Sequence, residues 1–159
     1  MKKALQQGGY DQLDIAILEE LQENGRTSVA DLARKIHLSQ PAVHNRIKRL
    51  EREGIIQQYV ALLNRKAIGY DLMCFVQIRL SSHQEDVIQK LTQAIQELVI
   101  VLECFLVTGQ SDMILKIVVE NQQALNNLIS KLTTLDGIER IETAVVLQEV
   151  KLTTALSLE

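Results

Sequence analysis

The spacing of apolar residues changes along this chain, and that change limits the folds it can adopt. In the first 64 residues, apolar side chains recur every three or four positions, the period of helices buried along one side. From Leu72 to Leu80 neighbouring side chains alternate between two sides, the period of a strand. We therefore expect two domains, a helical one at 1–64 and a mixed one at 71–159, with a linker at about residues 55–70.

Three helices are predicted in the first domain, because each expected start carries a capping residue. Asp11, Ser28 and Ser39 precede apolar runs of helical period, and their side-chain oxygens can accept from the free backbone N–H groups of a first turn. Pro41 then falls in the first turn of the third helix, where a missing N–H costs little, and Gly54 ends that helix. A short turn between two such helices is typical of a helix-turn-helix.

The outward face of the third helix is a candidate DNA-binding surface. Val43, Ile47 and Leu50 form its apolar stripe, so the opposite face points to solvent. Residues 34–52 hold six basic side chains and one acidic side chain in a chain of net charge -3, and phosphate binding depends on such local placement. A solvated helix face is the alternative. The candidate DNA contacts are Ser39, Gln40, Pro41, His44, Asn45, Lys48, Arg49 and Arg52.

The second domain is predicted to follow the order β-α-β-β-α-β, which is the ferredoxin-like plan. Strands are expected over 72–80, 100–107, 113–119 and 138–150, helices over 85–98 and 121–132, and one or two short strands over 55–63. Two helices can cover one face of this sheet, yet Met73 and Phe75 make the other side of the first strand apolar too. An uncovered apolar face predicts a second copy, and therefore a homodimer.

Nothing in the sequence predicts an enzyme, a cofactor or a metal site. The histidines, His37, His44 and His83, lie too far apart for metal-ligand spacing. Cys74 and Cys104 lie in apolar runs and are expected to be reduced core residues of a cytosolic protein. Phosphate-loop and nucleophile-elbow motifs are absent from the sequence, and so is an apolar run long enough to span a membrane.

Several stretches resemble the Lrp/AsnC family of bacterial and archaeal transcription regulators. They are YDQLDIAILEELQENGR, SVADLARKIHLSQPAVHNRIKRLEREGII and YVALLN, followed later by ECFLVTGQSD and AVVLQEVK. The resemblance implies an α+β chain with an N-terminal winged helix-turn-helix domain and a ferredoxin-like (ACT-like, RAM) ligand-sensing domain. It also implies dimers that assemble into tetramers or octamers, and a small amino acid as effector.

In that family the effector lies near a G-x-x-D turn, where neighbouring dimers meet. Carried over to this chain, the resemblance implies an effector site at Thr108, Gly109, Asp112 and Thr143. The Asp112 carboxylate suits an ammonium group, and Gly109 allows close backbone approach. A plain hairpin turn is the alternative, because Gly and Asp are common in turns. Ser111 and Ala144 depart from the family pattern, which often has an aromatic residue at the first position and a larger one at the second.

The function expected from these features is sequence-specific DNA binding by a cytoplasmic, nucleoid-associated transcription regulator. Its oligomerisation and DNA binding are expected to respond to a small amino acid. One alternative is an effector-independent architectural DNA-binding protein, which the departures at Ser111 and Ala144 leave open. Another is a ferredoxin-like interaction or enzymatic module whose N-terminal helices bind no DNA.

Overall fold

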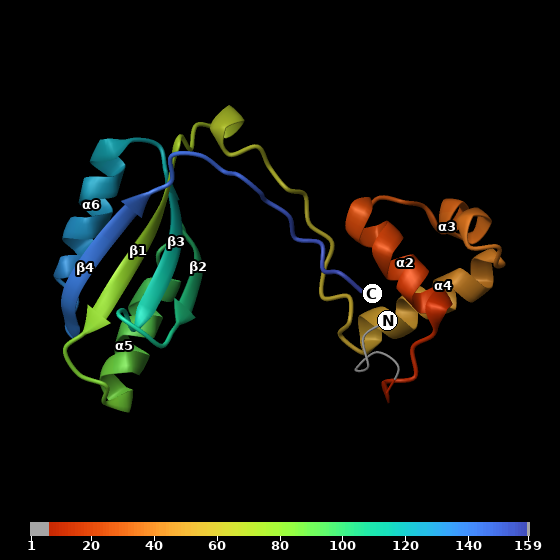
Figure 1. Cartoon of the computed structure of the whole chain (residues 1–159), viewed down its shortest axis with the longest axis horizontal. Coiled ribbons are helices and arrows are strands. Elements are labelled where there is room, and N and C mark those ends of the chain that lie inside the picture. The colour runs from red at the N-terminus through yellow and green to blue at the C-terminus, as the bar shows by residue number, and fades with distance from the viewer. Residues whose placement is uncertain (1–6, 159) are drawn as a thin grey trace. The chain divides into compact units, whose positions relative to one another are not determined.

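The computed structural model describes residues 7–158, which form two compact units (Figure 1). One unit comprises the chain up to Leu62 together with the C-terminal segment from Lys151, and the other runs from Leu63 to Val150. Each unit has a hydrophobic core of its own. We call them the helical unit and the sheet unit. The C-terminal segment differs from the sequence prediction, which assigned it to the second domain.

Among the residues that the structure describes, the helical unit contains the helices α2 (Gln12–Glu23), α3 (Val29–Lys35) and α4 (Gln40–Arg52). The Asp11 carboxylate accepts from the backbone N–H of Asp14 at 3.0 Å, and the Asp14 carboxylate accepts from that of Asp11 at 3.0 Å. This reciprocal cap fixes the start of α2. The turn from α3 to α4 places His37 at φ +54°, a left-handed conformation that is uncommon for residues other than glycine. The predicted helix-turn-helix is confirmed.

The core of the helical unit joins all three helices and the C-terminal segment. Its fully buried side chains are Ile17 from α2, Leu32 from α3, and Val43 and Leu50 from α4. Leu158 packs against this cluster. The Gln22 side chain also donates to the Leu156 carbonyl at 3.1 Å and accepts from the Leu156 N–H at 2.6 Å. These contacts explain why the last residues belong to the helical unit.

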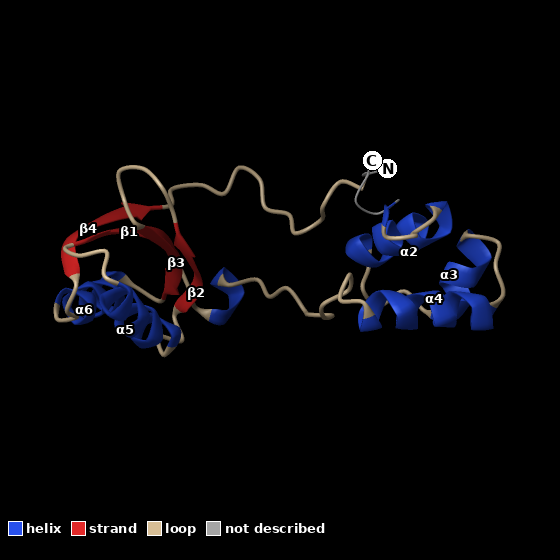
Figure 2. Cartoon of the chain, turned by 90° about the horizontal axis from the view of Figure 1, so that it is seen from below, coloured by secondary structure: helices blue, strands red, loops and turns tan. Residues whose placement is uncertain are grey.

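The sheet unit has the predicted β-α-β-β-α-β order, preceded by a 3-10 turn at Lys66–Ile68. Its strands pair antiparallel in the order β2-β3-β1-β4, and both helices cover the same face of the sheet (Figure 2). The ferredoxin-like plan, and with it the α+β fold class, is confirmed. The elements are β1 (Leu72–Leu80), α5 (Glu85–Gln96), β2 (Val101–Leu106), β3 (Met113–Val119), α6 (Gln122–Thr133) and β4 (Ile138–Val145).

The two faces of this sheet are opposite in character. On the covered face, alternate residues of β1 and β3 are fully buried with Leu91 of α5 and Leu128 of α6. On the open face, Phe75 of β1 is 39% exposed and Phe105 of β2 is 52% exposed. Large apolar side chains that remain in water are costly to leave uncovered. The predicted second apolar face is therefore confirmed.

Two strand predictions are wrong. The last strand ends at Val145 and not at residue 150. In the described chain it pairs with β1, which begins at Leu72, so β4 has no pairing partner beyond that point. The Val146 N–H makes a final bond to the Met73 carbonyl. Residues 55–63 form no strand, because no other segment of the described chain pairs with them. An extended segment counts as a strand only when a neighbour satisfies its backbone.

The two cysteines differ in burial. Cys74 is fully buried in the core of the sheet unit, and burial raises the pKa of its thiol. Cys104, predicted to be a core residue, is exposed, because β2 is an edge strand with a neighbour on one side only. None of the helices found between residues 7 and 158 is long and apolar enough to cross a membrane.

Candidate nucleic-acid interface and ligand site

The face of α4 opposite its buried stripe is polar and exposed. Val43 and Leu50 are fully buried, whereas the side chains on the opposite side of the helix reach solvent. The Ser39 hydroxyl caps the helix by accepting from the Ala42 N–H at 3.4 Å. The exposed sequence-predicted candidates are Ser39, Gln40, Pro41, His44, Asn45, Lys48 and Arg52. We call this surface the α4 face.

Arg49 is placed differently, because its guanidinium points back toward α2. Its Nη2 lies 2.5 Å from Oδ2 of Asp14, whose side chain is fully buried. The Arg46 Nη1 lies 2.8 Å from Oδ1 of Asp14 and 2.8 Å from Oδ1 of Asp11. The Tyr10 ring covers Arg49 from 5.3 Å, and the Tyr10 hydroxyl donates to Glu53 at 2.8 Å. The two arginines therefore join α4 to α2.

The electrostatics of this cluster favour its charged form. Burial opposes ionisation of the Asp11 carboxyl, but hydrogen bonds from Arg46 and from backbone N–H groups outweigh it and hold the Asp11 pKa below its usual value. The same bonds, from Asp11 and then Asp14, raise the pKa of Arg46. Sequence analysis did not identify Asp14 as an anchor. The sequence contains a pattern that could have predicted this role of Asp14. Asp11 and Asp14 are three residues apart, and so are Arg46 and Arg49.

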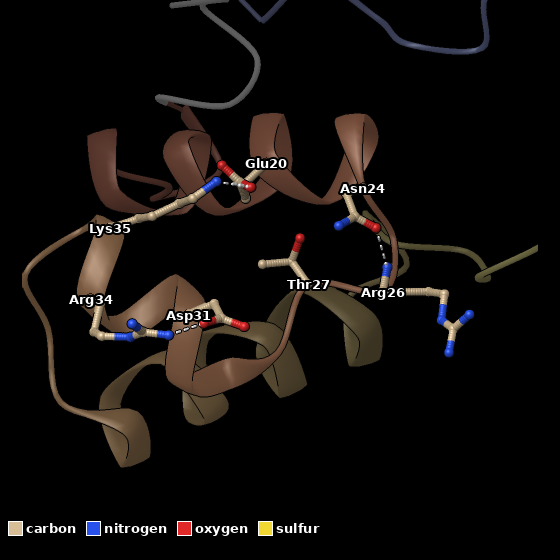
Figure 3. A pocket seen from close by; sticks show the side chains of 7 residues that line it. All are labelled: Glu20, Asn24, Arg26, Thr27, Asp31, Arg34 and Lys35. Atoms are coloured by element: carbon tan, nitrogen blue, oxygen red, sulfur yellow. Dashed lines mark hydrogen bonds and ion pairs between the residues drawn. The ribbon is translucent and has the colours of Figure 1, made fainter.

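A pocket between α2 and α3 contains further charges that are already paired (Figure 3). Lys35 forms an ion pair with Glu20, and Arg34 forms one with Asp31. Figure 3 shows both pairs within the pocket, and shows the Arg26 side chain directed away from them. A pocket lined by self-paired charges has little left to offer a charged ligand.

Fewer of the basic side chains in residues 34–52 are therefore free to bind DNA than the sequence indicates. Of the six basic residues from 34 to 52, Lys48 alone has no carboxylate partner within the described chain. Arg52 pairs with the adjacent Glu53 at 3.3 Å, and its side chain stays 72% exposed. Because exposed pairs are weak, Arg52 can exchange this partner for a phosphate. The cations that the α4 face offers to DNA are thus Lys48 and Arg52.

In the sheet unit, the sequence-predicted effector residues lie in different places: Thr108 and Gly109 are in the turn, and Thr143 is on β4. Asp112 already has partners: its Oδ2 accepts from the Leu80 N–H at 2.8 Å, and its Oδ1 lies 2.9 Å from His83 Nε2. The Leu80 bond, followed by the one from His83, lowers the pKa of Asp112. Thr143 pairs with Val76, whose side chain lies on the helix-covered face. Thr108 and Gly109 are exposed in the turn.

A different hollow lies on the open face, beside that turn. Gln77 and Arg79 of β1 and Arg140 and Glu142 of β4 line it, together with Gln110 and Ser111 of the turn. This group is not among the residues predicted from the sequence, because only the register of β1 against β4 brings the two arginines together. Among residues 7–158, no three His, Cys, Asp or Glu side chains gather closely enough to hold a metal ion.

A helix-turn-helix with a polar outward face, followed by a separate ferredoxin-like unit, is the plan of a transcription regulator with a ligand-binding domain. Residues 10–57 match the family model described as winged helix-turn-helix DNA-binding. Residues 73–156 match the model described as Lrp/AsnC ligand binding domain. The chain belongs to the Lrp/AsnC family, a family of DNA-binding transcription regulators rather than enzymes.

Curated and solved relatives agree with this assignment. The leucine-responsive regulatory protein of Escherichia coli K12 is 39% identical over 142 residues, which cover 89% of this chain and 87% of that protein. A regulator from Neisseria meningitidis, solved as its L-methionine complex, has a TM-score of 0.89 at 32% identity, covering 93% of this chain and 96% of that one. The AsnC structure from E. coli has a TM-score of 0.84 at 34% identity, covering 91% and 97%.

Proposed function

We propose that this regulator reads DNA with the α4 face and changes its DNA binding when the sheet unit binds a small amino acid. The observation that carries the proposal is the sidedness of α4, whose apolar stripe is buried and whose amide and basic side chains are exposed. Asn45 and Gln40 can make bidentate contacts with adenine in the major groove, and Arg52 can do so with guanine. Lys48 contacts phosphate, and the Ser39 hydroxyl can do so too.

The regulator is proposed to act as a homodimer that forms through the open face of the sheet. Phe75 and Phe105 are exposed there, and a second copy brings a matching apolar surface because the same patch meets itself across a two-fold axis. A dimer presents two α4 helices to half-sites about 34–36 Å apart, one turn of DNA, or a multiple of that. Tetramers and octamers are an extension of this proposal, and DNA binding places the protein at the nucleoid.

The amino-acid response is proposed from the family and from one relative. The sheet unit matches the family's ligand-binding domain, and the relative from N. meningitidis was solved as its L-methionine complex. An amino acid shifts DNA affinity only if it binds one state of the assembly more tightly than another. No catalytic role or cofactor is proposed for the chain.

Selection from a random-sequence DNA library tests this function directly. The full chain is incubated with the library at low and at physiological salt, with and without L-leucine and L-methionine, and the bound DNA is sequenced. We expect a palindromic motif whose occupancy changes with at least one amino acid. Binding without an enriched motif would indicate an architectural protein. Absence of binding even at low salt would indicate an interaction module and refute the proposal.

The dimer is tested by light scattering of the wild type and of Phe105→Asp. The wild type is expected to be dimeric or larger at micromolar concentration. The substitution places a charge in the proposed interface and is expected to raise the dimer dissociation constant by about 30-fold or more, about 2 kcal/mol. A monomeric wild type would contradict the proposed interface.

A further inference from the structure

The turn between α2 and α3 borders the α4 face of the helical unit. A hollow of about 290 Å³ lies between them. Gly25 and Thr27 of the turn line this hollow together with His44, Lys48 and Glu51 of α4. His44 and Lys48 belong to the α4 face. DNA that contacts these two side chains therefore comes close to the turn.

Arg26 lies in this turn, and hydrogen bonds fix its backbone. The Arg26 N–H donates to Asn24 Oδ1 at 3.0 Å, and the Thr27 N–H donates to the Asn24 carbonyl at 3.0 Å. An asparagine side chain that accepts from the backbone two residues further on is common in turns. Asn24 also ends α2, because its own N–H donates to the Glu20 carbonyl. The place of Arg26 is therefore set by the backbone and does not depend on its side chain.

The Arg26 side chain is exposed and free of internal ion pairs. Figure 3 shows it directed away from the two ion pairs of the neighbouring pocket. Among the lysines and arginines of residues 7–62, Arg26 and Lys48 are the two that have no carboxylate within ion-pair distance in the structure. A guanidinium is weakly hydrated, so Arg26 can exchange water for an anion without first giving up a carboxylate.

A second cation matters here because the hollow also carries a carboxylate. Glu51 lines it beside Lys48 and accepts from the Tyr59 hydroxyl at 3.2 Å. The Glu51 charge repels a phosphate and offsets the charge of Lys48. With Arg26 included, the net charge around the hollow becomes positive, and local positive charge is what attracts a duplex.

We propose that Arg26 binds a DNA phosphate, so that the DNA-binding surface extends from the α4 face onto the turn between α2 and α3. The guanidinium presents paired N–H donors that match two phosphate oxygens. A contact of this kind fixes how the helical unit lies on the duplex and carries no sequence information. The contact rests on the proposed DNA binding by the α4 face and lies outside that face.

A salt titration of DNA binding by the full chain tests the contact. The DNA is the duplex most enriched by library selection, and fluorescence anisotropy measures the affinity. Arg26→Gln removes the charge and keeps the backbone N–H that binds Asn24. We expect the slope of log affinity against log salt concentration to fall by about 1. The affinity should fall about fivefold at about 0.15 M salt and about 15-fold at about 0.05 M, since one fewer counterion is released.

Two further variants separate a phosphate contact from a change in net charge. Lys131→Gln removes one positive charge from an exposed position on α6 of the sheet unit, and its slope and affinity are expected to match the wild type. Arg26→Lys is expected to keep the slope and to bind more weakly, because a point charge replaces the paired donors. All three variants should unfold at the wild-type temperature, since neither side chain makes an ion pair in the described part of the chain.

Ethylation interference locates the contact on the same duplex. An ethylated phosphate has no charge, so ethylation at a contacted phosphate weakens binding. The wild type is expected to show one more interfering phosphate in each half-site than Arg26→Gln does. Library selection should return the same motif for both proteins, because a phosphate contact acts equally on all sequences.

An unchanged slope for Arg26→Gln beside a reduced slope for Lys48→Ala would overturn this contact alone. An identical set of interfering phosphates would do the same, as would an equal loss of slope in Lys131→Gln. A changed motif would show that Arg26 acts on bases and would also overturn it. A wild type that binds no DNA even at low salt would overturn the contact together with the proposed function.

Discussion

In the helical unit, Arg46 and Arg49 form ion pairs with Asp14, whose carboxylate is completely buried. In the sheet unit, by contrast, Arg79 and Arg140 lie opposite each other on neighbouring strands. The first arrangement satisfies its charges internally and fixes one helix against another. In the second, Arg140 pairs with Glu142, and Arg79 has no ion-pair partner among residues 7–158. Arginines with buried partners therefore stabilise the fold, and arginines without them are the better candidates for ligand binding.

Removing the Asp14 carboxylate is expected to have the largest effect on stability. Asp14→Ala leaves Arg46 and Arg49 partly buried without their shared partner and removes the bond from the Asp11 N–H, one half of the reciprocal cap of α2. We expect the free energy of unfolding to fall by about 3 kcal/mol, the low end for breaking a buried ion pair, since the arginines are partly exposed. Chemical denaturation followed by circular dichroism measures it.

The matched control is Asp86→Ala in the sheet unit. Asp86 pairs with Lys90 at 4.0 Å, and both side chains are largely exposed, so the loss should stay within about 0.5 kcal/mol. Equal losses in the two variants would show that burial of Asp14 does not distinguish the two pairs.

Arg49 and its neighbour Lys48 on α4 are expected to differ in their contribution to stability. Arg49→Ala is expected to lower the free energy of unfolding by about 1–2 kcal/mol, because it removes a hydrogen bond to a charged group. Lys48→Ala should leave stability within about 0.5 kcal/mol, since its side chain is exposed and lacks a carboxylate partner among the described residues.

For DNA binding, Lys48→Ala should have the larger effect and Arg49→Ala the smaller one. Lys48→Ala is expected to reduce the slope of log affinity against log salt concentration by about 1, the effect of losing one phosphate contact. Arg49→Ala should change this slope less. Fluorescence anisotropy over a series of salt concentrations measures both. If Arg49→Ala is as stable as the wild type and reduces this salt-dependence slope, Arg49 contacts a DNA phosphate, contrary to the expectation.

The smallest effect on stability is expected from lowering the pH, and it involves one carboxylate in each unit. The pKa values of Asp11 and Asp112 are both lowered in the folded state. Each carboxylate therefore adds stability above its unfolded pKa of about 3.9, and loses that contribution as pH falls through the folded value. Unfolding curves from neutral to acid pH should show this loss. Asp11→Asn and Asp112→Asn should each be less sensitive to acid, and unchanged sensitivity would contradict the assignment.

Local signals in the sequence predicted most of the fold. Asp11, Ser28 and Ser39 were identified as caps, and all three accept backbone N–H bonds at helix starts. The order of strands and helices followed from apolar period. The prediction of one or two short strands over residues 55–63 was wrong, because a strand depends on a neighbour as well as on its own composition.

The candidate sites were harder to predict, because they depend on which residues meet. Burial of α4 follows from its apolar stripe, so most of the α4 face was identified. The direction of the Arg49 side chain depends on Asp14, 35 residues away in the chain. The meeting of Arg79 with Arg140 depends on strand register, which no local pattern specifies.

The Gln22 bonds to Leu156 and the packing of Leu158 have a consequence for biosynthesis. A ribosome makes residues 10–56 before the sheet and the segment after Val150 once the sheet is complete. The DNA-reading half is consequently finished only after the half that follows it has emerged. A nascent chain that ends before Leu156 would hold helices that lack this packing partner.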